Sequence, residues 1–485
     1  MCIRDRAILV LITASALLSP SCTKKESSEP AIALPVLPNH LPMQEIEKRQ
    51  SVYAAVEMTY DKSLLSESEN EALEHLLNAA HIMDEIFLTQ VWDGNVALRD
   101  SLRKAATFSD GATAAEKNVA TEAEALLRFF NINFGPWDRI DNDSPFINKM
   151  AKPAYANFYP ADMTKEEFDT FVKTHPDQDA AFTGYFTTIR RADDGALTAV
   201  PYNKEYNSYL TEAAAELKTA ADILTAPENA GAFSEGVDYA TLATFLRSRA
   251  DALLSNDYYQ SDMDWMDVQH NIIDVTIGPY EVYEDGLFGY KAAFEAFIAV
   301  RNPADSKKLD GLKNYLQKLE NNLPIADKYK NPNRGSDSPI SVVDLVFTAG
   351  DTKAGVQTIA FNLPNDERVR EAKGSKKVML KNISTAKCQK ILVPIAETLL
   401  DPAQIQYVDF ESYFYNTLMH EFAHGLGPGN IALADGTEST VNKELKELYS
   451  FIEEAKADIL GLYNTGYLVK QGFFPKGADT KAYVT

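Results

Sequence analysis

Residues 66–87 read SESENEALEHLLNAAHIMDEIF, and this stretch decides the class of the fold. Its apolar side chains recur at helical spacing, and Ser66 supplies a start signal, so it predicts an amphipathic helix. The same pattern returns in residues 113–130, 208–224 and 238–254. The N-terminal half of the chain is therefore expected to be mostly helical.

One hairpin interrupts this helical half. Residues 185–202, YFTTIRRADDGALTAVPY, place an Asp194–Gly195 turn between two β-rich runs. A two-residue Asp-Gly turn with β-rich flanks predicts a β-hairpin.

Residues 265–400 have a mixed texture. Residues 292–300, AAFEAFIAV, and residues 309–323 are expected to be helical. Short β-rich stretches, separated by Gly, Pro and Asn, follow in SVVDLVFTAG (341–350), GVQTIAFNLP (355–364) and KKVMLKN (376–382). They predict a small sheet or partial barrel, so the fold class is α+β, mainly α with a small β-core.

A chain of 485 residues is longer than one hydrophobic core usually serves. The expected divisions are a signal peptide (1–22), a tether (23–44), a mostly helical lobe with one hairpin (45–264), a mixed α/β substrate-binding region (265–400) and zinc-binding catalytic helices (401–485).

The N-terminus has the pattern of an export signal. Ala7–Leu18 is an apolar run too short to span a bilayer, with Arg4 and Arg6 before it. The following SPSC ends at Cys22 and resembles the lipobox of bacterial lipoproteins, in which the cysteine is lipidated. We expect an exported lipoprotein on the periplasmic or cell-surface side, held to the membrane only by this anchor. Plain secretion is the alternative.

Charge and cysteine content exclude other classes. The net charge of −23 and the isoelectric point of about 4.8 repel nucleic acid and anionic lipid surfaces, so no nucleic-acid partner is expected. The three cysteines, Cys2, Cys22 and Cys388, are too few and too scattered for a disulfide framework or a cysteine zinc site.

A candidate metal motif lies in residues 415–429, YNTLMHEFAHGLGPG. On a helix, His420 and His424 lie one turn apart on one face, so both imidazoles can bind one Zn²⁺ ion. Glu421 has the position of the general base in HExxH metallopeptidases. The GLGPG run then ends the helix.

Two histidines need a third ligand. Asn430 stands where the extended HExxHxxGxxH motif has its third histidine, which disfavours that class. The alternative is Glu454 in SFIEEAKADILGLY, with Asp458 one turn later to orient a ligand histidine by hydrogen bonding. An acidic helix face alone is normally only solvated, but beside HExxH it completes a His–His–Glu site for one zinc ion.

Several segments together resemble the dipeptidyl peptidase III metallopeptidases. HEFAHGLGPG and EEAKADILGLY resemble the paired HExxGH and EExxAExxGLY motifs of that family. Residues 265–300 resemble its segment around IGxxESYxDPFG and EFEGFVAV, and residues 344–370 its strand region ending in NIPNYxxxR. The matching segments run in the same order over roughly residues 265–463.

The resemblance implies two lobes separated by a cleft, zinc bound on helices, and short peptides from which N-terminal dipeptides are released. His420, His424 and Glu454 would be the ligands and Glu421 the base. Asn362 and Asn365 would contact the peptide backbone, and Asp274 would meet the N-terminal amine.

The chain departs from the family in three ways. Its HExxH lacks the extra residue between the histidines, Thr276 replaces an oxyanion-stabilising tyrosine, and no histidine follows His424. Either the sequence is a fragment or this branch lacks the family's C-terminal catalytic histidine. Besides a dipeptide-releasing exopeptidase, two functions stay open: a zinc hydrolase of a non-peptide amide or ester, and a non-catalytic, peptide-binding surface lipoprotein.

Overall fold

The structure is a computed structural model that describes residues 36–485 except 110–111, 230, 302, 333–339 and 446–447. The expected signal peptide, Cys22 and residues 23–35 of the tether lie outside the described residues. Among the described helices, none has both the length and the apolar character needed to cross a bilayer.

The elements follow one another along the chain as helices first and a mixed region later. The helices are α1 (Met43–Gln50), α2 (Glu67–Val91), α3 (Asn95–Ala105), α4 (Ala114–Asn133), α5 (Lys165–Thr174), α6 (Asp179–Thr183), α7 (Tyr202–Glu205), α8 (Asn207–Thr225), α9 (Ala240–Ser255), α10 (Tyr259–Met266), α11 (Pro303–Asp310), α12 (Leu316–Asn322), α13 (Glu367–Lys373), α14 (Lys381–Lys387), α15 (Val393–Leu399), α16 (Phe410–His424), α17 (Val441–Leu445), α18 (Tyr449–Lys470) and α19 (Ala478–Ala482). The strands are β1 (Trp137–Asp138), β2 (Ser144–Pro145), β3 (Thr187–Arg191), β4 (Leu197–Pro201), β5 (Ile273–Pro279), β6 (Phe294–Arg301), β7 (Ile340–Gly350), β8 (Ala360–Leu363), β9 (Lys376–Leu380), β10 (Asn430–Ala432) and β11 (Glu438–Thr440).

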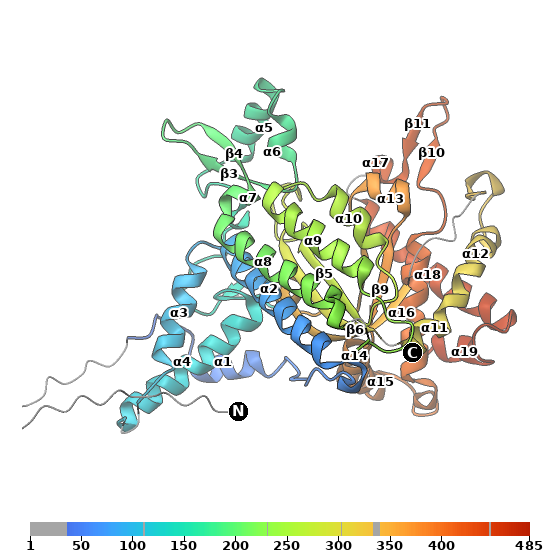
Figure 1. Ribbon diagram of the computed structural model, residues 1–485, viewed down its shortest axis with the longest axis horizontal. Coiled ribbons are helices and arrows are strands. Elements are labelled where there is room, and N and C mark those ends of the chain that lie inside the picture. The colour runs from blue at the N-terminus through green and yellow to red at the C-terminus, as the bar shows by residue number, and fades with distance from the viewer. Residues whose placement is uncertain (1–35, 110–111, 230, 302, 333–339, 446–447) are drawn as a thin grey trace, which may run out of the picture.

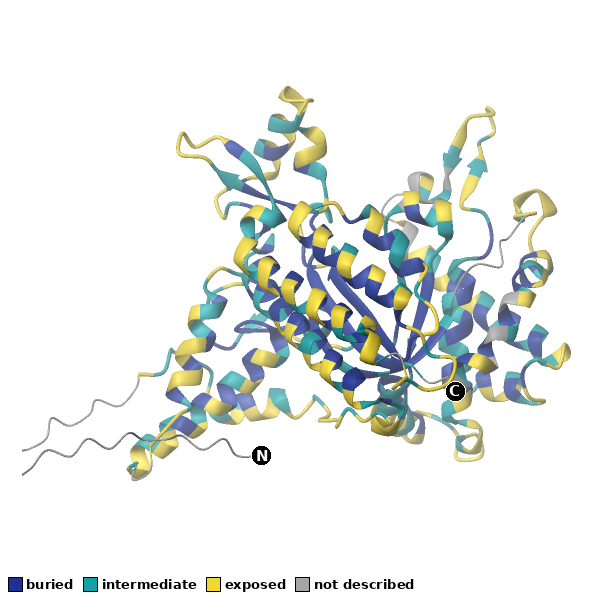
Figure 2. Cartoon of the chain, viewed as in Figure 1, coloured by how far each residue is buried: buried dark blue, intermediate teal, exposed yellow. Residues whose placement is uncertain are grey.

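Helix α2 is the long helix that the opening stretch predicts. The Ser66 hydroxyl accepts from the Glu69 amide at 3.3 Å and the Glu69 carboxylate accepts from the Ser66 amide at 2.7 Å, which closes a capping box. Helices α2, α8 and α9 lie side by side over one face of the central sheet (Figure 1). Their exposed sides face solvent, whereas the strands behind them are buried (Figure 2).

The central sheet has the strand order β5-β6-β7-β9-β8. All neighbours are antiparallel except β7 and β9, and β8 forms one edge. The Asn365 side-chain amide, two residues after β8, donates to the Tyr280 carbonyl, directly after β5, at 3.2 Å, which shows that the sheet curls. The two edge strands therefore approach each other at one end, as in a partial barrel. Strands β3 and β4 form the hairpin around Asp194–Gly195.

The helix expected over residues 292–300 is wrong, because this segment is strand β6. Phe294, Ala296 and Ile298 face the large hydrophobic cluster, and the alternate residues face the opposite side of the sheet. Both faces are buried, so the segment lacks the polar alternation that marks a half-exposed strand. Its alanines and Glu295 favour a helix in isolation, and tertiary packing overrides that preference.

Two hydrophobic clusters hold the sheet between the N-terminal helices and the later ones. The first joins α2, α4, α8 and α9 to β5 and β6, so it crosses the boundary expected at residue 264. The second contains Leu418, Met419 and Phe422 of α16 together with Ala360 of β8 and Met379 of β9, and so joins α16 to the sheet. Helix α16 is thereby fixed beside edge strand β8. The α+β class is confirmed.

Buried carboxyl groups gather at the end of β5–β7. Burial and the neighbouring Glu281 raise the pKa of Glu295 well above its ordinary value. Burial and Glu284 raise the pKa of Asp351 to about 7. Glu284 itself forms ion pairs with Arg139 at 2.8 Å and Lys152 at 2.9 Å. The fold therefore binds protons here that the unfolded chain releases.

We expect Asp351→Asn to reduce the fall in unfolding free energy between pH 5 and pH 8. The folded pKa of Asp351 lies above its unfolded value, so its stabilising contribution is lost as pH rises toward about 7. The substitution should remove on the order of 1 kcal/mol of this pH dependence. Urea unfolding at both pH values measures it, with exposed Asp177→Asn as control. An equal fall in unfolding free energy from pH 5 to pH 8 in the wild type, Asp351→Asn and Asp177→Asn would contradict this expectation.

Candidate metal centre

Helix α16 carries the HExxH residues. The Asp409 carboxylate accepts from the Ser412 amide at 3.0 Å and caps its N-terminus, and the helix ends at His424, where the Gly-rich run begins. Its buried side chains Phe414, Leu418 and Phe422 recur every four residues and pack into the second cluster. His420 and His424 therefore lie on another side of the helix, half-exposed.

Helix α18 approaches α16 very closely, and Gly461 permits it. A Cβ atom at Gly461 would lie 3.0 Å from the backbone nitrogen of His420. Backbone cannot move aside as a flexible side chain can, so a larger residue would push the helices apart. This contact brings Glu454, two turns before Gly461, over the two histidines.

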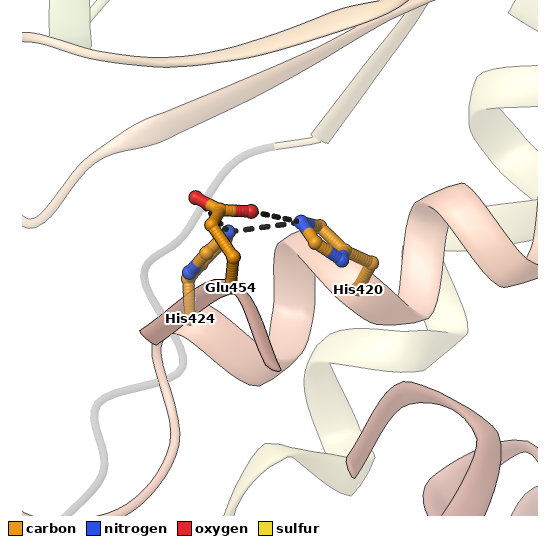
Figure 3. A group of neighbouring side chains, drawn as sticks. All are labelled: His420, His424 and Glu454. Carbon is orange, nitrogen blue, oxygen red and sulfur yellow. Dashed lines mark hydrogen bonds and ion pairs between the residues drawn. The ribbon is translucent and has the colours of Figure 1, made fainter. Parts of the chain in front are cut away.

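The three side chains converge on one point (Figure 3). The Nε2 atoms of His420 and His424 are 3.0 Å apart. The Glu454 carboxylate oxygens lie 3.3 Å from His420 Nε2 and 3.8 Å from His424 Nε2. One ligand atom from each residue lies within 4.8 Å of the others. The residues that the sequence singles out as ligands are thus brought together from two helices.

Each histidine has its own carboxylate behind it. Asp458 Oδ1 lies 2.8 Å from His420 Nδ1, and Glu453 Oε1 lies 3.1 Å from His424 Nδ1. A carboxylate accepts the Nδ1 proton and leaves the Nε2 lone pair directed at the shared point. Glu453 is not among the site residues predicted from the sequence. Glu453 stands next to Glu454 in the EE pair and four residues before Ala457, which is fully buried. This helical spacing is the sequence feature that places Glu453 on the inner side of α18.

Glu453 is itself held by a lysine. Lys456 Nζ lies 2.7 Å from Glu453 Oε1 and donates to the Leu426 carbonyl at 3.1 Å. Burial acts to raise the pKa of Glu453, but the bonds from His424 and Lys456 lower it. The bond to Glu453 in turn raises the pKa of His424. A cation that takes the shared position therefore competes with protons for the imidazoles.

Glu421 lies between the histidines in sequence and faces the same space. It lines a pocket together with His420 and with Thr358–Ala360 of the sheet edge. Burial raises the pKa of Glu421, while His424 and His420 act to lower it. The Glu421 carboxylate therefore lies beside the metal-binding group, whose three members are His420, His424 and Glu454, and is not itself one of them.

The donor set fits zinc. Tetrahedral Zn²⁺ with bonds of about 2.0–2.1 Å separates neighbouring ligand atoms by about 3.3 Å, close to the observed 3.0, 3.3 and 3.8 Å. Two imidazoles and one carboxylate leave a fourth position open, which is the arrangement of catalytic rather than structural zinc sites.

The residues expected to bind peptide lie on the sheet. Asp274 is buried on β5, where it acts electrostatically on Lys376. Asn362 lies on edge strand β8, and its amide oxygen is buried without a hydrogen-bond partner among the described residues. Asn365 is bound to the Tyr280 carbonyl and to Arg370. Within the described part of the chain, no hydrogen bond or ion pair joins them to the metal-binding group.

Thr276 stands at the position of the family's oxyanion-stabilising tyrosine, and this position is not accessible to a substrate. Thr276 is fully buried on β5, and its hydroxyl has no partner among the described residues. Tyr283, in the loop between β5 and β6, is 83% exposed. Its pKa is raised chiefly by Glu281, and Glu454 contributes as well. Tyr283 is thus within electrostatic reach of Glu454.

Substitutions should distinguish the effect of losing the ligand Glu454 from that of losing Asp458, which orients His420. Asp458→Asn is expected to weaken zinc binding by about 10- to 100-fold, because it removes the carboxylate that orients His420. Glu454→Gln should weaken it further, since a ligand is lost. Competition with a chromophoric chelator measures both affinities, and exposed Glu397→Gln is the control. Equal zinc affinity in all variants would contradict the arrangement.

Comparisons with known proteins place the chain among metallopeptidases. The sequence profile of peptidase family M49 matches residues 146–473. The solved structure of DPP III from Caldithrix abyssi is 52% identical with a TM-score of 0.81, covering 90% of this chain and 78% of that one. Dipeptidyl-peptidase III from Corallococcus sp. strain EGB is 43% identical with a TM-score of 0.79, covering 92% and 78%.

Curated relatives are matched over less of their length. Nudix hydrolase 3 of Arabidopsis thaliana is 36% identical over 489 residues, which cover 91% of this chain and 60% of that protein. Dipeptidyl peptidase 3 of Nematostella vectensis is 25% identical over 279 residues, covering 50% and 37%. This chain thus spans less than two thirds of each. The family profile covers more than half of the chain, the resemblance is confirmed, and the protein belongs to peptidase family M49.

Proposed function

We propose that the protein is a zinc-dependent exopeptidase that releases dipeptides from the N-terminus of short peptides. The observation that carries this proposal is the convergence of His420, His424 and Glu454 beside Glu421 at an open sheet edge. The names of the structures from Caldithrix abyssi and Corallococcus support the same activity. The name Nudix hydrolase 3 describes a plant protein that is only partly matched, so we propose no such activity here.

Zinc, when bound, would polarise a carbonyl group and lower the pKa of water. The chain's own residues supply the rest. Glu421 takes the proton of the attacking water and returns it to the amine that leaves. Asp458 and Glu453 hold the two imidazoles in one tautomer and orientation.

Edge strand β8 supplies a docking line for the peptide. Among the described strands it has a sheet neighbour on one side only, so its other side can pair with an extended peptide. The unpartnered amide oxygen of Asn362 then accepts a peptide N–H, and Asn365 helps to fix the backbone. Asp274 pairs with the N-terminal ammonium and sets the dipeptide register.

Glu421→Gln should keep zinc and lose about 10²- to 10⁴-fold in kcat, because the general base is removed and the ligands stay. Zinc content and turnover of a dipeptidyl-naphthylamide measure the two effects, and Glu411→Gln on the same helix is the matched control. If the zinc-loaded wild type cuts neither short peptides nor these amides, the peptidase proposal fails.

A zinc hydrolase of some other amide or ester is the second candidate. Buried Thr276 favours it, because that position offers no phenol to a tetrahedral oxyanion. A mixed peptide library followed by mass spectrometry separates the two. Products that lose two residues at a time exclude the second candidate, and tight peptide binding without turnover would favour a non-catalytic binding protein.

We also propose that Cys22 is lipidated and anchors the exported protein. The apolar run followed by SPSC carries this proposal. Cys22→Ser should abolish labelling by tritiated palmitate in bacterial cells and move the protein out of the membrane fraction, whereas Cys388→Ser should change neither. Label that persists in Cys22→Ser would contradict it.

A further inference from the structure

Helix α16 ends at one of its own metal-binding residues. His424 is the last residue of the helix and Gly425 its C-cap, whereas His420 lies one full turn inside. The carbonyl groups of a last helical turn have no partners further along the helix, so helix ends fray unless other groups hold them. The position of His424 therefore depends on what holds the turn that follows it, residues 425–429.

One peptide group in this turn is held from both sides. It joins Leu426 to Gly427, and we call it the 426–427 peptide. Its carbonyl oxygen accepts from Lys456 Nζ at 3.1 Å, and its N–H donates to the Glu320 carboxylate at 3.0 Å. A trans peptide is planar, with its C=O and N–H directed to opposite sides. Helices α18 and α12 therefore hold this group between a positive and a negative side chain.

Glu320 is a buried charge to which the proposed mechanism gives no role. Its side chain on α12 is fully buried. A buried carboxylate is costly unless hydrogen bonds replace the water that it loses. One of its oxygens accepts from the Gly427 amide, and the other accepts from the Asn331 amide at 2.8 Å. Glu320 therefore ties α12 and the segment at Asn331 to the turn that follows His424.

The charges on the two sides select one orientation of the 426–427 peptide. If this peptide turned over, its carbonyl oxygen would face the Glu320 carboxylate and its N–H would face the Lys456 ammonium, and both contacts would be repulsive. The neighbouring residues limit the turn further. The Leu426 side chain is buried in the second hydrophobic cluster, and Gly427 has a φ of +82°, which favours glycine. The end of α16 is therefore fixed by packing and by charge together.

The held peptide is connected to the His424 side chain as well as to its backbone. Lys456 Nζ lies 2.7 Å from Glu453 Oε1, and this oxygen lies 3.1 Å from His424 Nδ1. Hydrogen bonds that involve charged groups are stronger than neutral ones, and bonds in a chain polarise one another. A continuous path thus runs from Glu320 through the 426–427 peptide, Lys456 and Glu453 to the imidazole.

We propose that Glu320 and Lys456 are positioning residues for the metal centre, which keep the His424 imidazole directed at the bound ion by holding the 426–427 peptide between them. The inference rests on the zinc site of the proposed function and does not depend on which substrate is cut. His420 lies within the helix and is oriented by Asp458, so the loss of Glu320 or Lys456 should affect His424 selectively.

The Kd for zinc, measured by competition with a chromophoric chelator, is the first test. Lys456→Met keeps the length of the side chain without its charge and should weaken zinc binding about tenfold. Glu320→Gln should weaken it about three- to tenfold, because glutamine has one acceptor oxygen for two backbone amides. Lys456→Arg should restore most of the affinity, since it keeps the positive charge and its donors. Asp409→Ala removes the cap at the other end of α16 and is the matched control, which should lower Tm and leave the zinc Kd within about twofold.

Two further measurements separate positioning from a general loss of stability. Because both residues act through one peptide group, Glu320→Gln with Lys456→Met together should weaken zinc binding no more than Lys456→Met alone. In zinc-loaded protein labelled with ¹⁵N-histidine, the Nδ1 proton of His424 should exchange with solvent faster in both single variants. The Nδ1 proton of His420, identified by its change in Asp458→Asn, should exchange at the rate of the wild type.

Equal zinc Kd values in the wild type, Lys456→Met and Glu320→Gln would overturn this inference, and so would additive losses or equal changes in proton exchange at both histidines. Where buried Glu320→Gln does not fold, Lys456→Met and its rescue by Lys456→Arg decide alone, since the Lys456 side chain is 28% exposed. A wild type that binds no zinc overturns the metal centre as well. Zinc binding that weakens as expected, without turnover of the dipeptidyl-naphthylamide or of peptides by the wild type, overturns the peptidase proposal and leaves this inference standing.

Discussion

The close packing of α16 against α18 at Gly461 is the constraint on which the metal centre depends. The two histidines come from one helix and their carboxylate from the other, so ligand geometry is set by an interhelical distance. A glycine at the crossing lets backbone lie against backbone. The distances from Glu454 to both histidines, and both carboxylate–histidine bonds, follow from that separation, whereas the distance between the two imidazoles is set within α16.

The sheet places the substrate edge beside those helices. Leu418 and Met419 share one hydrophobic cluster with Ala360 and Met379, which ties α16 to β8 and β9. The opposite strands, β5 and β6, belong to the core of the N-terminal helices. One small sheet therefore connects the N-terminal helices with the helix that carries the metal-binding histidines. Its curl brings the end of β5 to the end of β8.

Local sequence patterns are enough to predict much of the fold and most of the residues of the metal centre. Helical spacing identified α2, and HExxH with Glu454 and Asp458 identified residues that the structure places together. Strand β6 was missed because burial on both faces erases the alternation that marks a strand. Glu453 was missed because only the rotation of α18 about its axis tells which acid of the EE pair meets His424.

The two histidines differ in the setting of their partner carboxylates. The Asp458 side chain is 76% exposed, whereas Glu453 is 17% exposed and is also held by Lys456. Dissolved ions screen an exposed pair far more than a half-buried one. High ionic strength should therefore loosen the orientation of His420 while His424 stays fixed. The orientation of His420 would then be lost before that of His424, and His424 would hold a bound ion longest.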